Sequence, residues 1–293
     1  HHFIKVLSFV LSGNRFFKVF EIRDFWPQIF IDMGAMSPRS KIAKIFFKVE
    51  RYLISKSDMF VSNLSGAERY CKEKGIVYNC FYWVPNGVRE KYRAESIEPA
   101  ILEGQPCKAK IMYTGAHGKA QNLYEVMKAA KCLLRDDQVE FHFLGDGTEK
   151  YPLQSYVDEN NIGNVYFYNP VNTEDVKKFI LAADVLLLPL VDAKIFSYGI
   201  SPNKLPEYLA SGKPIIFFGP QSASPFVDGV EAIVSSGTDS IDLVAAVKRY
   251  LLMSESETKK IKEESNRLME SKFLLDQSMG GLVREMLSQI NAR

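Results

Sequence analysis

The spacing of apolar residues changes repeatedly along the chain, and this change predicts a mixed α/β protein. Short runs rich in β-branched and aromatic residues predict strands, whereas longer segments with an apolar residue at every third or fourth position predict helices. In the first third of the chain, strands are expected at 17–22, 59–61 and 80–84, and the clearest helix is expected at 40–55.

The expected helix at 40–55 has two interpretations. Its apolar face is formed by Ile42, Ile45, Phe46, Val49 and Leu53. An amphipathic helix of this kind usually buries its apolar face in the core of the protein. The stretch 39–56 is also basic and aromatic, so contact with the surface of an anionic membrane is the alternative.

The same alternation starts again after Pro99 and continues over most of the remaining chain. Strands are expected at 110–114, 140–144, 165–168, 185–190, 215–218 and 232–234, and helices at 121–134, 151–159, 176–182, 202–210 and 241–252. Strands that are apolar throughout and alternate with helices are typical of parallel sheets with helices on both faces.

This pattern predicts two Rossmann-like domains followed by a terminal helix. The first domain is expected at 1–98 and the second at 99–275, after a strand that ends in an Asn86-Gly87 turn. A helix at 276–293 is expected to pack back on the first domain. Only three strands are readable before Pro99, where a Rossmann-type domain has about six, so the first domain is expected to be incomplete in this chain.

Composition excludes several classes of protein. With 46% hydrophobic and 25% charged residues among 293, the chain is neither disordered nor collagen-like. No apolar run approaches the roughly 18 residues that cross a bilayer. The four cysteines have irregular spacings that indicate neither a zinc site nor a disulfide framework, so a reducing, cytoplasmic location is expected.

The net charge of +2 is unevenly distributed. Residues 1–98 hold 16 Lys and Arg against 10 Asp and Glu, so the expected first domain is basic. A basic domain is compatible with a polyanionic partner or an anionic membrane surface, and equally with an ordinary solvated surface.

The loop at 113–121 carries residues suited to a phosphate group. Gly115 and Gly118 allow close approach of the backbone, Lys119 adds a positive charge, and a helix is expected to begin directly after them. His117 is near enough in sequence to enter the same cleft. A tight turn with a solvated lysine is the alternative interpretation.

Two further loops follow strands that are expected to lie in the same sheet. The loop at 144–148 contains Gly145, and the loop at 168–171 contains Pro170. Ligands of doubly wound sheets bind at the carboxyl ends of the strands, so both loops offer backbone groups at a common edge, and the loop at 168–171 would offer its groups to a flat base. Each loop alone is equally explained as an ordinary turn.

The run 196–214 is the richest of these loops. Ser201 is expected to cap a helix that begins at Pro202. Lys204 and Glu207 share one face of that helix. The helix N-terminus and Lys204 together suit an anion, and Glu207 suits the two hydroxyls of a ribose. An ordinary helical ion pair between Lys204 and Glu207 is the alternative.

Several motifs together resemble one enzyme family. The run 196–214 is similar to the Pro-Asn-Lys-x-x-Glu-Tyr-x-Ala-x-Gly-Lys-Pro signature of retaining GT-B glycosyltransferases of family 4, especially the bacterial O-antigen and capsular polysaccharide group. Residues 23–27 resemble the group's Arg-Asp-x-Trp-Pro motif, and 85–88 match its Pro-Asn-Gly-Val hinge. The resemblance extends from about residue 21 to the C-terminus. It implies an α/β protein of the GT-B fold, with two Rossmann-like domains built on parallel sheets.

The resemblance also implies roles for individual residues. Glu207 would hold the donor ribose, Lys119 would neutralise the donor diphosphate, and Asp24 would contact the acceptor or act as a base. A structural bridge from Asp24 to Arg23 or Trp26 is the alternative. The implied donor-binding residues are Gly115, His117, Gly118, Lys119, Gly145, Pro170, Gly199, Ile200, Ser201, Pro202, Asn203, Lys204 and Glu207.

One position departs from the family pattern. The first glutamate of the family's Glu-x7-Glu signature falls on Gly199, which removes a carboxylate that many relatives direct at the donor sugar. The backbone N–H groups of Gly199 and Ile200 are expected to replace it. No Asp-x-Asp pair occurs in the sequence, which agrees with a metal-independent reaction in which lysines and a helix N-terminus stabilise the departing diphosphate.

The expected function is that of a retaining, metal-independent hexosyl or N-acetylhexosaminyl transferase. The nucleoside diphosphate sugar would be the co-substrate, with no cofactor, and a saccharide or lipid-linked molecule would be the acceptor in surface polysaccharide biosynthesis. The expected location is the cytoplasm, at the inner face of the cell membrane, and nucleic acid is not expected as a partner. A sugar-nucleotide epimerase of the same fold and a non-catalytic accessory subunit that binds nucleotide sugars are the alternatives.

Overall fold

The computed structural model describes residues 16–90, 97–136 and 139–291, which form two compact units. Unit 1 comprises the described residues of His1–Asn86, Ala193–Ser201 and Leu275–Arg293, and unit 2 comprises those of Gly87–Asp192 and Pro202–Leu274. The division falls at Asn86, before the boundary expected near Pro99. Residues 1–15 of the expected first domain lie outside the described residues.

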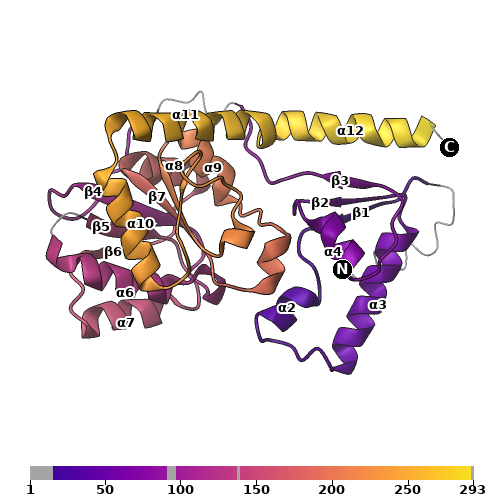
Figure 1. Cartoon of the computed structure of the whole chain (residues 1–293), viewed down its shortest axis with the longest axis horizontal. Helices are drawn as coiled ribbons and strands as arrows, with labels where there is room; N and C mark the ends of the chain where they lie inside the picture. The colour runs from indigo at the N-terminus through magenta and orange to yellow at the C-terminus, as the bar shows by residue number, and fades with distance from the viewer. Residues whose placement is uncertain (1–15, 91–96, 137–138, 292–293) are drawn as a thin grey trace. The chain divides into compact units, whose positions relative to one another are not determined.

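The described part of unit 1 contains a parallel sheet in the order β1-β2-β3 (Figure 1). The strands β1 (Val19–Ile22), β2 (Met59–Ser62) and β3 (Phe81–Trp83) confirm those expected in this part of the chain. Among the described residues of this unit, the α-helices are α2 (Gln28–Asp32), α3 (Lys41–Lys56), α4 (Ala67–Glu73) and α12 (Leu275–Asn291). Every residue of β2 is buried, because β2 is the central strand.

Helix α3 buries only part of the face expected from its apolar residues, with Leu53 inside. Ile42 and Ile45 are each 59% exposed and Phe46 is 40% exposed. The side chains that the helix buries are Ala43, Glu50, Leu53 and Ile54. Glu50 is tolerated inside because the Tyr70 hydroxyl donates a hydrogen bond to its carboxylate over 2.9 Å. The interpretation of Ile42, Ile45 and Phe46 as core residues is therefore wrong.

The core of unit 1 includes a segment from far along the chain. The 3-10 helix η3 (Lys194–Tyr198) contributes Tyr198 to a hydrophobic cluster that also contains Phe25 and Tyr70. Phe25 stacks on Tyr70 with ring centroids 3.8 Å apart, and Tyr198 packs edge-on against Tyr70 at 5.3 Å. The segment 193–201 is thus built into unit 1, although the residues on either side of it in the chain belong to unit 2.

Unit 2 contains a larger parallel sheet whose described strands follow the order β6-β5-β4-β7-β8-β9. These strands are β4 (Ala109–Thr114), β5 (Val139–Leu144), β6 (Val165–Tyr168), β7 (Val185–Pro189), β8 (Ile215–Phe218) and β9 (Ile233–Val234), and they confirm every strand expected after Pro99. This is the strand order of a Rossmann-type sheet, in which ligands bind at the carboxyl ends of the strands, next to the point between β4 and β7 where the winding reverses.

Helices cover both faces of the unit 2 sheet (Figure 1). One layer holds α6 (Leu123–Leu133), α7 (Lys150–Glu159) and α10 (Ser240–Leu252), and the other holds α8 (Thr173–Ala182), α9 (Lys204–Ser211) and α11 (Glu255–Lys272). The first layer and the strand residues Ile111, Tyr113, Phe141 and Phe143 form one hydrophobic cluster. Coverage on both faces explains why β7 and β8 are apolar throughout. None of the described helices is long and apolar enough to cross a membrane.

Candidate nucleotide-sugar site

The loops after β4, β5 and β6 lie against one another at the carboxyl edge of the unit 2 sheet. The Gly115 N–H donates a hydrogen bond to Leu144 O over 2.9 Å, which joins the first loop to the second. The Gly145 N–H donates to Tyr168 O over 3.3 Å, which joins the second loop to the third. The three loops expected at a common site are therefore brought together.

The contact between the first two loops requires glycine at position 145. Gly145 has a φ of 144°, and a Cβ added there would lie 2.0 Å from Gly115 O. Any larger residue would combine an unfavourable backbone conformation with a steric clash. Gly145 therefore lets two loop backbones approach within van der Waals contact, whether or not it also touches a ligand.

Lys204, the first residue of α9, reaches the loop after β4. Its Nζ lies 3.7 Å from the centroid of the Tyr113 ring, and a Cβ added at Gly115 would lie 3.0 Å from the same Nζ. Burial lowers the pKa of Lys204 to about 7, and the Glu207 carboxylate opposes this shift. A bound anion would favour the charged form of such a lysine. The structure thus places a strongly desolvated cation beside the candidate phosphate loop.

A tyrosine fixes α9 to the end of β4. The Thr114 N–H donates to the Tyr208 hydroxyl over 2.8 Å, which positions the helix that carries Lys204 and Glu207. Burial raises the pKa of Glu207, and Lys204 opposes this rise. The Lys204 ammonium contacts the Tyr113 ring rather than forming an ion pair with Glu207. Glu207 is partly buried and lies in the first turn of α9, and its contact with a ribose stays a prediction.

Lys119 and Gly118 stand at the start of a 3-10 turn instead of an α-helix. The 3-10 helix η1 (Lys119–Gln121) comes first, with Gly118 extended before it. Helix α6 then begins at Leu123 instead of residue 121, because Asn122 adopts a left-handed conformation with φ 51°. The Lys119 side chain is exposed.

His117 is fully buried, so the expectation that its ring enters a cleft is wrong. The ring packs among Tyr113, Phe143 and Phe167, at centroid distances of 5.9, 6.3 and 6.0 Å. Burial and the nearby charges of Lys150 and Lys204 lower the pKa of His117 to about 4. Neither ring nitrogen has a hydrogen-bond partner among the described residues. His117 therefore supports the loop after β4 from beneath.

Lys150, the first residue of α7, joins two of the loops, and the sequence pattern does not single it out. Its Nζ donates to Gly145 O over 3.0 Å, to Tyr168 O over 3.1 Å and to Asn169 Oδ1 over 3.1 Å. Pro170 follows Asn169 and is exposed. The contacts of Tyr113 and Tyr208 are also missed from the sequence, because both residues are indistinguishable there from ordinary core aromatic residues.

The run 196–214 is divided between the two units. In the part that belongs to unit 1, Gly199 has a φ of 103°, and a Cβ added there would lie 2.7 Å from Ser65 Oγ. The Gly199 N–H donates to Phe196 O over 3.0 Å, so the expectation that it is available to a donor sugar is wrong. Ile200 is partly exposed beside it. A larger side chain at position 199 would therefore clash with Ser65.

Ser201 does not cap the following helix, which begins at Lys204 instead of Pro202. Asn203 occupies the cap position. The Ser201 hydroxyl instead accepts a hydrogen bond from the Asn86 N–H over 3.0 Å, and the Asn86 side-chain amide donates to Ser201 O. The expected cap fails because its hydroxyl is used within unit 1.

Asp24, the expected acceptor-side residue, follows β1 in unit 1 and is an exposed residue. Partial burial of its carboxylate raises the pKa of Asp24, and Arg23 opposes this shift. Arg23 itself donates to Asn86 Oδ1 over 3.1 Å and lies 3.9 Å from the Glu21 carboxylate. Arg23 is thus engaged elsewhere, and the hydrogen-bonded bridge to Asp24 is not formed.

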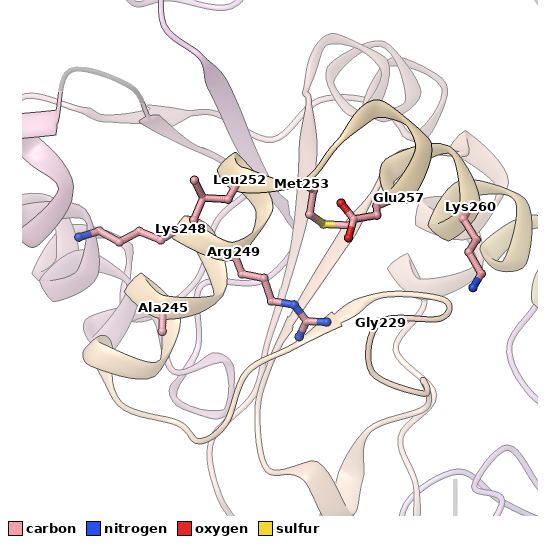
Figure 2. A pocket seen from close by; sticks show the side chains of 8 residues that line it. All are labelled: Gly229, Ala245, Lys248, Arg249, Leu252, Met253, Glu257 and Lys260. Carbon is pink, nitrogen blue, oxygen red and sulfur yellow. The ribbon is translucent and has the colours of Figure 1, made fainter.

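A surface hollow elsewhere on unit 2 does not include any of these residues (Figure 2). It is lined by Gly229, Ala245, Lys248, Arg249, Leu252, Met253, Glu257 and Lys260. Arg249 forms an ion pair of 2.8 Å with Asp228, and the Glu257 carboxylate accepts a hydrogen bond from the Ser254 N–H over 2.9 Å. Arg249 and Glu257 are thus engaged with neighbouring groups of the protein.

Comparison with known proteins agrees with this geometry. Residues 108–252 match the family described as glycosyl transferases group 1. The match covers β4 to α10, and therefore the loops after β4, β5 and β6 and the helix that carries Lys204 and Glu207. No curated protein matches the chain in sequence.

The fold is shared with solved glycosyltransferase structures. Sucrose-phosphate synthase from Thermosynechococcus elongatus matches with a TM-score of 0.74 and 16% identity, over 95% of this chain and 70% of that one. Anabaena HepE in complex with UDP and glucose matches with a TM-score of 0.74 and 12% identity, over 98% and 75%. The pneumococcal O-GlcNAc transferase GtfA in complex with UDP and GlcNAc matches with a TM-score of 0.64 and 14% identity, over 98% and 60%. The chain therefore has the GT-B fold, and its residues 108–252 form a group 1 glycosyltransferase domain.

Proposed function

We propose that the chain transfers a sugar, with retention of anomeric configuration and without a metal ion, from a nucleoside diphosphate sugar to a saccharide or lipid-linked acceptor in surface polysaccharide biosynthesis. The observation that carries the donor assignment is the position of Lys204. Lys204 is partly buried, its pKa is lowered to about 7, and its ammonium lies beside the glycine loop after β4, where a Rossmann-type sheet binds its ligand. Relatives of the same fold include complexes with UDP and a sugar.

The proposed chemistry places positive charge where the leaving group becomes negative. The bond between the anomeric carbon and the diphosphate oxygen breaks, and the acceptor oxygen forms a bond to the same face of the sugar. The acceptor proton passes to the departing diphosphate. Lys204 and Lys119 stabilise that diphosphate, as preorganised charges do at other transition states. Glu207 binds the ribose, and Asp24 is the proposed contact for the acceptor.

The exposed face of α3 supports a membrane-bound acceptor. Ile42, Ile45 and Phe46 are exposed on a helix that also carries exposed lysines, among them Lys44 and Lys48. Apolar side chains combined with basic ones suit the interface of an anionic membrane. We propose that this face, the α3 apolar face, brings the protein to lipid-linked acceptors at the inner face of the cell membrane.

Titration calorimetry with the full chain tests the donor proposal. UDP, GDP and dTDP are titrated first, and then the sugars of whichever nucleotide binds. Lys204→Met and Glu207→Ala are expected to weaken binding. Lys128→Met is the matched control, because Lys128 is an exposed lysine paired with Glu125 on the outer surface of α6. Absence of binding to every nucleotide would overturn the proposal.

A transfer assay then separates the remaining alternatives. The bound donor is incubated with and without lipid-linked saccharides, and the anomeric configuration of the product is read by NMR. Transfer with retained configuration supports the proposal. Conversion of the nucleotide sugar without an acceptor would instead indicate an epimerase, and nucleotide binding without any turnover would indicate an accessory subunit.

A further inference from the structure

Lys150 is a buried lysine whose hydrogen-bonding capacity is fully used by two loops. Only 6% of the residue is exposed. Its ammonium group has three N–H donors, and three acceptors lie within 3.1 Å: Gly145 O, Tyr168 O and Asn169 Oδ1. All three acceptors are neutral carbonyl oxygens. The group therefore joins two backbone carbonyls and one side-chain amide of the two loops.

A buried ammonium is an expensive way to join two loops. Removing a charge from water costs several kcal/mol unless the charge is well hydrogen-bonded, and an apolar side chain would fill the same volume without that cost. Neutral acceptors compensate such a charge less completely than a carboxylate does. A role in holding particular atoms in place accounts for a lysine here, because an apolar side chain packs without fixing the positions of carbonyl oxygens.

The atoms that Lys150 holds belong to the candidate nucleotide-sugar site. Gly145 is in contact with Gly115, at the centre of the candidate phosphate loop. Tyr168 and Asn169 lead directly into Pro170, the residue expected at the nucleotide base. Lys150 therefore connects the loop after β5, which packs on the candidate phosphate loop, to the loop after β6.

We propose that Lys150 is a positioning residue that sets the affinity of the site for the nucleoside part of the donor. It fixes the loop at 168–170 relative to the loop at 145–147, and it touches no ligand itself. This inference rests on the proposed function, since it names the part of the donor that the connected loops recognise. The inference predicts that loss of the Lys150 hydrogen bonds lowers the affinity for the nucleoside much more than the affinity for the diphosphate.

The test compares a nucleotide with a ligand that lacks the nucleoside. The full chain is titrated with the best-bound nucleoside diphosphate, and inorganic pyrophosphate is then used as a competitor, so that weak binding also gives a value. In Lys150→Met, nucleotide affinity is expected to fall about 10-fold or more, the size of effect that loss of one or two buried hydrogen bonds produces. Pyrophosphate affinity is expected to change less than about 2-fold, because the loop after β4 is left in place.

Three further variants make the result specific. Lys119→Met is expected to weaken nucleotide and pyrophosphate alike. Lys177→Met is the matched control, since Lys177 is also 6% exposed but lies on α8, in the opposite helix layer. Lys150→Arg keeps the charge but replaces three divergent donors with a planar group. It is expected to fold and to show the same selective loss, so the test stands even if Lys150→Met does not fold.

The outcomes separate this inference from the function on which it rests. A wild-type chain that binds no nucleotide would overturn the proposed function. A wild-type chain that binds nucleotide, with equal losses of nucleotide and pyrophosphate affinity in the Lys150 variants, would overturn the positioning role alone. Unchanged affinity for both ligands in folded Lys150 variants would overturn it as well.

Discussion

The ammonium group of Lys204 lies 3.7 Å from the centroid of the Tyr113 ring, at the end of the central strand β4. A cation over an aromatic face is stabilised by the ring quadrupole, which partly offsets the loss of water around this partly buried lysine. The Tyr113 hydroxyl donates to Ala116 O over 2.5 Å, so the same tyrosine also holds the loop beside the cation. Tyr113 therefore contacts both the charged group on α9 and the backbone of the candidate phosphate loop.

Affinity for a nucleoside diphosphate is expected to fall as the pH rises above the Lys204 pKa of about 7. Below that pH the lysine is charged before the ligand arrives. Above it, binding must bring a proton onto the lysine, which lowers affinity by at most about 10-fold for each pH unit. Titration calorimetry in two buffers of different ionisation enthalpy would show this proton uptake.

Two variants control the origin of that pH dependence. Lys204→Met should remove the proton uptake, and Tyr113→Leu should weaken binding because the cation loses its aromatic support. Tyr113→Phe keeps the ring and should bind more tightly than Tyr113→Leu. Wild-type affinity that stays constant across neutral and alkaline pH would contradict the assignment.

Gly145→Ala is expected to destabilise unit 2 and to abolish nucleotide binding. The new Cβ would lie 2.0 Å from Gly115 O, at a φ of 144° that alanine rarely adopts. We expect a loss of about 3 kcal/mol, from backbone strain and steric overlap together. Denaturant unfolding of the full chain measures the loss. Gly163→Ala is the control, because a Cβ there has no atom within 4 Å; equal effects of the two variants would refute the argument.

Gly199→Ala is expected to release the segment 193–201 from unit 1. Gly199 has a φ of 103°, and its Cβ would meet Ser65 Oγ at 2.7 Å. Hydrogen exchange should become faster at the amides of this segment, and Gly199→Glu, which restores the family carboxylate, should accelerate it further. Gly75→Ala is the control for backbone strain alone, since Gly75 has a φ of 61° and its added Cβ would have open space around it, without a steric clash. Protection that survives in Gly199→Glu would show that the segment is not held by this contact.

Stability is expected to fall as the pH is lowered from about 6.5 towards 4, because of His117. Its pKa is lowered from 6.5 to about 4 in the folded chain. Between these two values the unfolded chain binds a proton that the folded chain does not, so the unfolded state is favoured. Above the unfolded pKa the effect is absent. Calorimetric melting temperatures at a series of pH values measure the fall.

His117→Phe should flatten part of this acid-induced fall, since a buried phenyl ring neither titrates nor leaves a nitrogen without a partner. The pKa of His142 is also lowered to about 4 by burial, so His142→Phe should flatten another part. A pH profile in His117→Phe that is identical to wild type would contradict the burial of this ring.

Substitution of the α3 apolar face is expected to weaken binding to anionic vesicles. Ile42→Glu and Ile45→Glu add negative charge and remove apolar surface from the proposed contact, and flotation with phosphatidylglycerol vesicles measures the effect. Val77→Glu is the control, because Val77 is 77% exposed but lies outside α3. Salt should also reduce flotation, because it screens the basic residues. Equal flotation of wild type with neutral and anionic vesicles would contradict the electrostatic part of the proposal.

The sequence by itself determined the strand positions, the alternation of strands with helices, and the loops that meet at the candidate site. These features depend on local patterns: β7 and β8 are apolar throughout because helices cover both faces of their sheet, and Gly115 and Lys204 stand next to recognisable strand and helix boundaries. The match at residues 108–252 covers this same region.

Only the tertiary structure decided which chemical groups in those loops are available. His117 is buried, the Ser201 hydroxyl accepts a hydrogen bond from Asn86, and the Gly199 N–H donates one to Phe196. In the sequence, all three residues are indistinguishable from solvent-accessible loop residues. Lys150 likewise resembles a surface lysine at a helix start, but holds two loops together. The physical reason is that hydrogen bonding and burial depend on neighbours distant in the chain, which periodicity and motif spacing do not encode.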